Sequence, residues 1–268
     1  HNSRFPGMLE GDLNSLMAAC QLGKKRVEEC IKVHGTEALL LAFETTISQT
    51  QYALESQIKK LIPEGKWAFR DRIDSDAVSE RGYFVDAVLQ HKNSELTIDF
   101  TQTDQQADGP INFIMDESVP KFRLGLYLTR DMPGIIMNAG FVRALGKIKT
   151  APGTLLSPLS PAPLGLRSHS MFRVNSAIFG CLVQAMNGQG SAASCVYVLY
   201  YLRGKKPSGG EELCIEGLSV GYGARNFADG LDAVYYVAQE NYPIEFAEME
   251  FGLEIEQFGV HCDSGGAG

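Results

Sequence analysis

The stretch Gly217-Leu-Ser-Val-Gly221-Tyr-Gly223-Ala-Arg225 sets the character of the C-terminal third of the chain, and Asp229-Gly230 follows it closely. Glycine at this density weakens a regular strand, because each glycine lacks a side chain that could pack. The segment is therefore predicted to contain turns and close backbone approaches, with polar groups directed inward. We expect Arg225 and Asp229 to form a buried ion pair or polar network that fixes the loop.

Two interpretations of residues 221–225 are compatible with this pattern. One is an anion-binding nest, in which backbone amides and Arg225 receive a carboxylate or a phosphate. The other is tight packing at a bent strand, which needs glycine for steric reasons alone. A Walker loop is excluded because no Gly-Lys-Ser/Thr follows, and the spacing does not fit a dinucleotide-binding fingerprint.

The next motif along the chain is Asn241-Tyr-Pro243-Ile-Glu245. Pro243 lacks an amide donor, so residues 241–248 are predicted to be irregular or to lie at a sheet edge, next to a subunit or domain interface close to the active cavity. Glu245 and Glu248 would meet on a helix but not on a strand, and could then serve acid–base catalysis or ligation. The simpler alternative is a pair of solvated or subunit-facing carboxylates.

The remaining sequence predicts an α+β protein with three regions. Residues 1–65 predict a hairpin of two antiparallel helices, because apolar residues recur at helical spacing before and after Gly35. Residues 66–165 predict an antiparallel β-meander, a helix that starts at Ser118, and short strands broken by prolines. Residues 166–268 predict a mixed, β-rich region that packs with one long apolar helix at 171–186 and ends in a strand at 251–260.

Composition excludes several classes of protein. A net charge of −8 argues against a nucleic-acid partner, since no basic stripe offsets phosphate charge. No apolar run reaches the roughly 18 to 20 residues of a spanning helix, and no signal peptide is visible, so we expect a cytoplasmic protein without membrane association. The six cysteines are scattered without a Cys-x-x-Cys pair, which favours free thiols in a reducing compartment.

The residues alone predict no self-sufficient catalytic site. His169 precedes the apolar helix and is more typical of a cap or a core group than of a ligand. His261, Cys262 and Asp263 could bind a metal, but neighbouring residues of a strand point to opposite faces and do not converge easily. No Gly-x-Ser-x-Gly elbow and no spaced Cys/His pair is present. Catalytic residues are therefore unknown from the sequence, and no metal is assigned to this chain.

Several of these motifs occur together in one protein family. The glycine-rich stretch with Asp229-Gly230, the Asn-x-Pro-Ile-Glu motif and the terminal Asp263-Ser-Gly-Gly-Ala-Gly268 resemble the hydantoinase B/oxoprolinase family. Three further stretches fit that family in the same order: Gly11-Asp12-Leu13-Asn14 with Ala18-Ala19, Asp99-Phe100-Thr101-x-Thr103-Asp104, and Gly109-Pro110-Ile111-Asn112. The candidate substrate or interface residues are Asp12, Asn112, Arg225, Asp229, Asn241, Glu245 and Asp263.

The resemblance implies a subunit of an ATP-dependent enzyme that works with a hydantoinase A-type ATPase subunit in a hetero-oligomer. ATP with Mg is expected on that partner. A divalent metal (Mn, Zn or Fe) is expected on an upstream half of the subunit, and none of these groups is expected to bind to this chain. The chain begins at His1 rather than Met and stops in a glycine-rich run, which indicates the second half of a longer subunit.

Activities of the family divide into two branches, ATP-dependent opening of hydantoins, 5-oxoproline or lactams, and carboxylation of ketones such as acetone or acetophenone with bicarbonate. The stretch Leu166-Arg-Ser-His169-Ser-Met-Phe-Arg-Val-Asn175, with Ile178-Phe-Gly180, is more similar to the ketone carboxylase branch. Val220 stands where ring-opening members favour glycine. The sequence therefore favours a ketone carboxylase subunit, with ring opening as the alternative and a non-catalytic scaffold as the second alternative.

Overall fold

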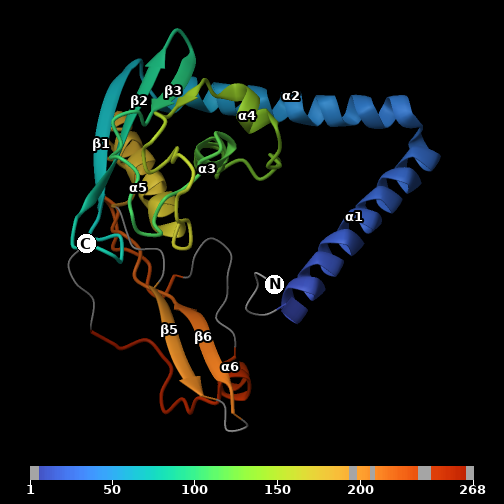
Figure 1. Ribbon diagram of the computed structural model, residues 1–268. Helices are drawn as coiled ribbons and strands as arrows, with labels where there is room; N and C mark the ends of the chain where they lie inside the picture. The colour runs from blue at the N-terminus through green and yellow to red at the C-terminus, as the bar shows by residue number, and fades with distance from the viewer. Residues whose placement is uncertain (1–5, 193–197, 206–208, 235–242, 264–268) are drawn as a thin grey trace.

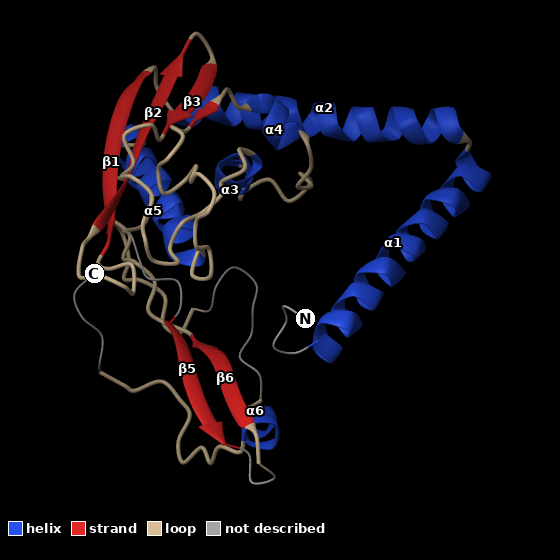
Figure 2. Ribbon diagram, in the orientation of Figure 1, coloured by secondary structure: helices blue, strands red, loops and turns tan. Residues whose placement is uncertain are grey.

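The computed structural model describes residues 6–192, 198–205, 209–234 and 243–263. Its elements are arranged as a pair of N-terminal helices, a four-stranded sheet packed against a long helix, and a separate two-stranded hairpin (Figures 1 and 2). The predicted α+β class is confirmed. Within these ranges no helix combines the length and the apolar composition that crossing a bilayer requires.

The first two helices, α1 (Pro6–His34) and α2 (Thr36–Leu61), are joined at Gly35. Gly35 has a φ of 81°, which residues with a side chain rarely adopt, so the chain can change direction within one residue. Figure 1 shows the two helices diverging from this joint. Both predicted helices are confirmed, but they do not pack along their lengths. No residue of α1 is buried, and the buried residues of α2 all lie in its second half.

The sheet contains the predicted meander. Its strands are β1 (Gly65–Ile73), β2 (Tyr83–Lys92) and β3 (Glu95–Asp99), which are antiparallel, and β4 (Ile148–Lys149), which runs parallel to β3. Asn93 and Ser94 both have positive φ, as a tight two-residue hairpin turn requires. Alternate residues of β2 from Tyr83 to Leu89 are buried, so one face of the sheet meets the core.

Helix α5 (Ser168–Ala185) covers this buried face and confirms the predicted apolar helix; α3 (Ser118–Leu128) and the short α4 (Gly140–Ala144) lie nearby (Figure 1). Gly180 marks the close approach to β1, because a Cβ atom there would collide with the ring of Phe69. Gln184 Nε2 donates a hydrogen bond to Ala68 O at 2.9 Å, which also fixes α5 on β1.

One hydrophobic cluster contains residues of the sheet, of α3 and of α5. The sheet and α5 thus share a core although they lie on opposite sides of the boundary predicted near residue 165. The division into three regions stays a prediction.

The C-terminal part departs most from expectation. The hairpin of β5 (Val198–Lys205) and β6 (Glu211–Leu218) is as predicted. Residues 244–251, however, form helix α6 (Ile244–Phe251), and the strand predicted at 251–260 is wrong, since no strand is present between 252 and 263. Gly252 in the left-handed conformation ends α6. Between residues 141 and 165 the predicted short strands reduce to α4 and the two residues of β4.

Candidate functional site

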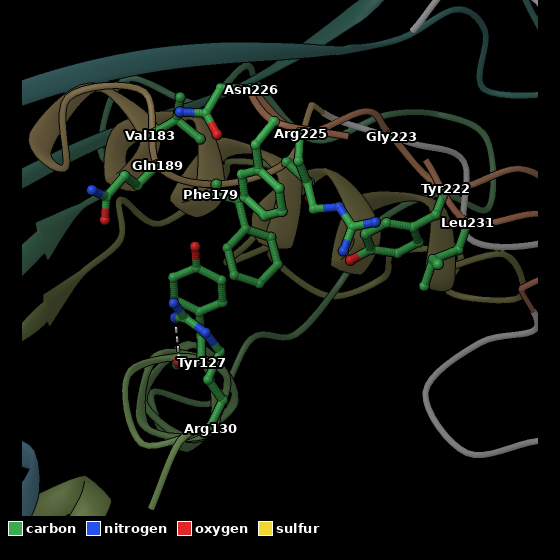
Figure 3. A pocket seen from close by; sticks show the side chains of 13 residues that line it. Tyr127, Arg130, Phe179, Val183, Gln189, Tyr222, Gly223, Arg225, Asn226 and Leu231 are labelled. Atoms are coloured by element: carbon green, nitrogen blue, oxygen red, sulfur yellow. Dashed lines mark hydrogen bonds between the residues drawn. The ribbon is translucent and has the colours of Figure 1, made fainter. Parts of the chain in front are cut away.

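A pocket of about 550 Å³ lies where the glycine-rich segment meets the ends of α3 and α5 (Figure 3). Tyr127 and Arg130 line it from the end of α3, and Phe179 lines it from α5. The wall opposite α3 consists of residues from the 222–231 segment. Segments that are distant in the sequence therefore build one cavity.

The glycines of this region allow close approaches between backbone segments. A Cβ atom at Gly223 would collide with the carbonyl of Ala192, and one at Gly230 would collide with the carbonyl of Tyr222. Only glycine can be accommodated at such distances, since the obstructing atoms belong to the backbone and cannot rotate away. The packing interpretation of the glycine-rich segment is supported at these two positions.

Backbone hydrogen bonds hold the segment in place. They run from Ala192 N to Ala224 O (2.8 Å), from Tyr222 N to Leu231 O (2.7 Å) and from Arg225 N to Ala228 O (2.9 Å). The amides of Tyr222 and Arg225 are thereby used within the loop. An anion at this site would depend on side-chain donors more than on a nest of these amides.

The predicted buried ion pair between Arg225 and Asp229 is wrong. Arg225 Nη2 donates to the backbone carbonyl of Asp229 at 3.1 Å, and the side chain of Asp229 is exposed. The tight turn between the two residues directs the carbonyl, not the carboxylate, toward the guanidinium. Arg225 itself is half-buried, with its Cζ atom 5.4 Å from the centroid of the Phe227 ring.

The α3 side of the pocket combines aromatic rings with a second cation. The rings of Tyr127 and Phe179 are 5.1 Å apart between centroids, in a tilted arrangement. The Cζ atom of Arg130 lies 4.6 Å from the Tyr127 centroid, and Arg130 Nη1 donates to Tyr127 O at 3.0 Å. Among the described residues, the pocket lining contains two arginines, Arg130 and Arg225, and no Asp or Glu. It is therefore a cationic cavity with aromatic walls, suited to an organic anion.

Sequence reasoning found Arg225 but missed Tyr127 and Arg130, and it assigned Phe179 only to a core helix. These side chains come from two helices whose sequence patterns report burial. No local pattern signals that α3 and α5 end against the same loop.

Asn112, another candidate from the family resemblance, has a structural role. It is fully buried, with its Oδ1 accepting from Ala107 N at 2.8 Å. Its Nδ2 donates to Ala107 O (2.8 Å), Gly109 O (3.2 Å) and Pro163 O (3.1 Å). These bonds occupy both the amide oxygen and the amide nitrogen, so Asn112 ties two loops together and offers little to a ligand.

Asp76 holds the other side of the same loop. Its Oδ1 accepts from the amides of Val78 (3.1 Å) and Ser79 (2.7 Å) and from the Ser79 hydroxyl (3.0 Å). Its Oδ2 accepts from the Tyr83 hydroxyl and from Gly109 N, both at 3.0 Å. Burial alone would raise the pKa of Asp76, but these hydrogen bonds hold its pKa well below the usual range of a carboxyl group.

The other candidates are dispersed. Asp12 is exposed on α1, Glu245 is exposed in the first turn of α6, and Asp263 is exposed near the end of the described chain. Asn241 lies outside the described residues. Of the candidates that the structure describes, only Arg225 lines the pocket.

Glu248 and Glu245 lie on one helix, as their pairing requires, but Glu248 has a structural contact. Its Oε1 accepts a hydrogen bond from Ile255 N at 2.9 Å, which holds the segment after α6. That segment, α6 and the β5–β6 hairpin line a second cavity of about 600 Å³. Leu253 and Ile255 line this cavity, so the alternation predicted to be a strand reflects one-sided burial without a neighbouring strand.

Metal ligation and thiol chemistry find little support in the described ranges. No three His, Cys, Asp or Glu residues there are grouped in a way that could hold a metal ion. Burial raises the pKa of Cys181 to about 11, so this thiol is protonated at neutral pH. His261 and Cys262 are exposed on an irregular segment.

Comparison with solved structures defines the class of fold. The chain is similar to an ATP-dependent caprolactamase from Pseudomonas jessenii, with a TM-score of 0.79 and 22% identity over 97% of this chain and 46% of the other. It is also similar to a nucleotide-free acetone carboxylase, with a TM-score of 0.71 and 17% identity over 90% of this chain and 34% of the other.

The hydantoinase B/oxoprolinase family matches residues 1–268, and the chain belongs to this family. One curated relative is the B subunit of a putative D-/L-hydantoinase from Pseudomonas sp. (strain NS671), 28% identical over 96% of this chain and 45% of its own length. Another is an uncharacterized protein from Methanocaldococcus jannaschii, 27% identical over the whole chain and 46% of its own length. The chain thus spans less than half the length of these relatives.

Proposed function

We propose that this chain is part of a hydantoinase B-type subunit of an ATP-dependent enzyme that opens a cyclic amide, such as a hydantoin. The observation that carries the proposal is the 28% identity with the B subunit of a D-/L-hydantoinase across 96% of the chain, in a family whose match covers residues 1–268. The proposed partner is a hydantoinase A-type ATPase subunit, which would bind ATP with Mg in a hetero-oligomer.

ATP would drive the reaction because the amide bond of an unstrained ring resists hydrolysis. Transfer of a phosphoryl group to the amide oxygen makes that oxygen a leaving group. Addition of water to the ring carbon, cleavage of the carbon–nitrogen bond and release of phosphate then give a carboxylate and an amine. This chain's part in such a reaction would be to bind and orient, since its pocket offers cations and aromatic faces.

Ketone carboxylation is the second candidate, and it rests on the stretch from Leu166 to Gly180. Ile178 is buried in the core and Gly180 lies against Phe69. Both residues are therefore constrained by packing of α5 on the sheet. They carry less weight for the choice of substrate than their sequence similarity suggests. A scaffold role without catalysis is the third candidate.

One experiment separates the three candidates. The native complex, purified with its co-purifying polypeptides, is incubated with ATP and either a hydantoin or acetophenone with labelled bicarbonate. Ring opening predicts ATP consumption with the hydantoin and no need for bicarbonate. Fixation of label into the ketone would overturn the proposal in favour of carboxylation. Activity that persists after Arg225 and Arg130 are replaced by glutamine would support a scaffold role.

A further inference from the structure

We propose that the pocket between α3, α5 and the 222–231 segment binds the carboxylate of a small organic acid with a flat or ring-shaped body. This deepens the proposed function, and rests on it only for the identity of the acid. Opening a cyclic amide and carboxylating a ketone both produce a carboxylate, so such a site would serve either branch.

Charge is the first argument. Arg130 and Arg225 bring two guanidinium groups to a cavity whose described lining holds no carboxylate, in a chain whose net charge is −8. A local excess of positive charge in an acidic protein marks a site for an anion rather than a general surface property.

The arginines retain donors for a ligand. A guanidinium has five N–H donors, and the contact of Arg225 with Asp229 O occupies Nη2. Arg130 lies 3.6 Å from the Asp131 carboxylate, but both side chains are largely exposed, so this pair is weak and can be exchanged for a bound anion. A carboxylate matches the planar fork of arginine.

The aromatic walls indicate the body of the ligand. Tyr127 and Phe179 form one half-buried surface on the α3 side, and Tyr222 contributes a ring from the opposite wall (Figure 3). A volume of about 550 Å³ falls within the usual range for a small-molecule site. Inorganic phosphate would use the arginines but not these rings, and a neutral ring would use the rings but not the arginines.

The glycines explain why the pocket can exist here. Gly223 and Gly230 let the loop pass close to Ala192 and Tyr222, and a Cβ atom at Gly190 would collide with the side chain of Val183 inside the same cavity. Larger residues at these positions would displace the wall that carries Arg225.

The test measures binding to the 268-residue chain without ATP or a partner. Benzoate is titrated by isothermal calorimetry, with benzamide as a neutral ligand of the same shape and inorganic phosphate as an anion without a ring. We expect benzoate to bind about tenfold or more tightly than either, since a charge-assisted hydrogen bond contributes on that scale. Equal binding of benzamide, or preference for phosphate, would overturn the proposal.

Variants assign the binding to the two arginines. Arg225→Gln and Arg130→Gln are each expected to weaken benzoate binding about tenfold, with Arg225→Lys intermediate because it keeps the charge but loses the fork. Arg167→Gln, at an exposed position outside the pocket lining, is the matched control and should leave binding unchanged. If the glutamine variants bind benzoate as well as the parent does, the pocket is not the site. Such a result would not affect the proposed ring-opening activity, which the assembled enzyme tests separately.

Discussion

The carboxylate of Asp76 is fully buried and accepts hydrogen bonds from Val78, Ser79, Tyr83 and Gly109, so the fold stabilises its ionised form. Its pKa is lower in the folded chain than in the unfolded one. A depressed pKa contributes stability above the unfolded value, about 4 for aspartate, and that stability is lost as the pH falls through the lower folded value.

Asp76→Asn is therefore expected to lower the Tm by several degrees at pH 7. An amide nitrogen in place of one carboxylate oxygen would face N–H or O–H donors and leave at least one of them unpaired. The difference in Tm between the two proteins should shrink below about pH 4, where the parent begins to lose the ionised carboxylate. Thermal unfolding measured at a series of pH values checks both effects.

Asp74→Asn is the matched control, because the Asp74 side chain is 95% exposed and its pair with Arg72 at 3.6 Å lies in solvent. This variant should unfold at nearly the parent temperature at each pH. A Tm of Asp76→Asn that differs from the parent by a constant amount from pH 7 to pH 3 would show that ionisation of Asp76 does not stabilise the fold.

At the level of single residues, the sequence could indicate which loops are constrained, but not which atom faces which. Asn112 stands out by its motif, yet its amide holds Ala107, Gly109 and Pro163. Arg225 and Asp229 do interact, but through a carbonyl oxygen. Side-chain direction in a turn depends on backbone angles that composition leaves open.

Among the secondary-structure elements, the contact between α5 and β1 gives the sharpest steric prediction. Alanine is normally favoured over glycine within a helix, yet a Cβ atom at position 180 would meet the ring of Phe69. We expect Gly180→Ala to destabilise the chain by about 1–3 kcal/mol, because the ring or the helix must move. Denaturant unfolding monitored by circular dichroism measures this change.

Gly23→Ala serves as the control, since no atom within 4 Å obstructs a Cβ atom at that position of α1. It should leave global unfolding unchanged or raise helix stability slightly. Combining Gly180→Ala with Phe69→Leu should recover part of the loss if the two residues are coupled. Additive effects in the double variant would contradict a direct clash.

The pattern-based predictions of elements succeeded where one period persisted and failed where burial was one-sided. The meander and α5 follow from long, regular patterns. Residues 253–258 alternate because Leu253 and Ile255 face the hairpin, but no neighbouring strand in the described chain supplies ladder hydrogen bonds. Pro243 predicts irregular structure by its missing amide donor, whereas it directly precedes α6, where that donor is not needed.

For the molecule as a whole, the surface of α1 is the feature that a self-contained fold would not show. Leu9, Leu13, Leu16 and Met17 lie on one stripe of the helix, and each is about half exposed or more. A helix with an apolar stripe normally buries it against a core. The chain covers less than half the length of its curated relatives, so we expect further parts of such a subunit to cover this stripe.

The last prediction concerns this stripe. Leu13→Glu with Leu16→Glu should reduce the concentration-dependent association of the 268-residue chain and its binding of the dye ANS, because the double variant removes apolar area and adds two charges. Since α1 contributes no buried residue, the Tm of the sheet and α5 should not change. Asn14→Glu with Gln21→Glu adds the same charge on the polar face and should leave association as it was. Sedimentation velocity at several concentrations distinguishes the two variants. A marked fall in Tm for the leucine variant would mean that α1 folds back onto the core in solution, and the stripe would then be a part of this chain's own interior.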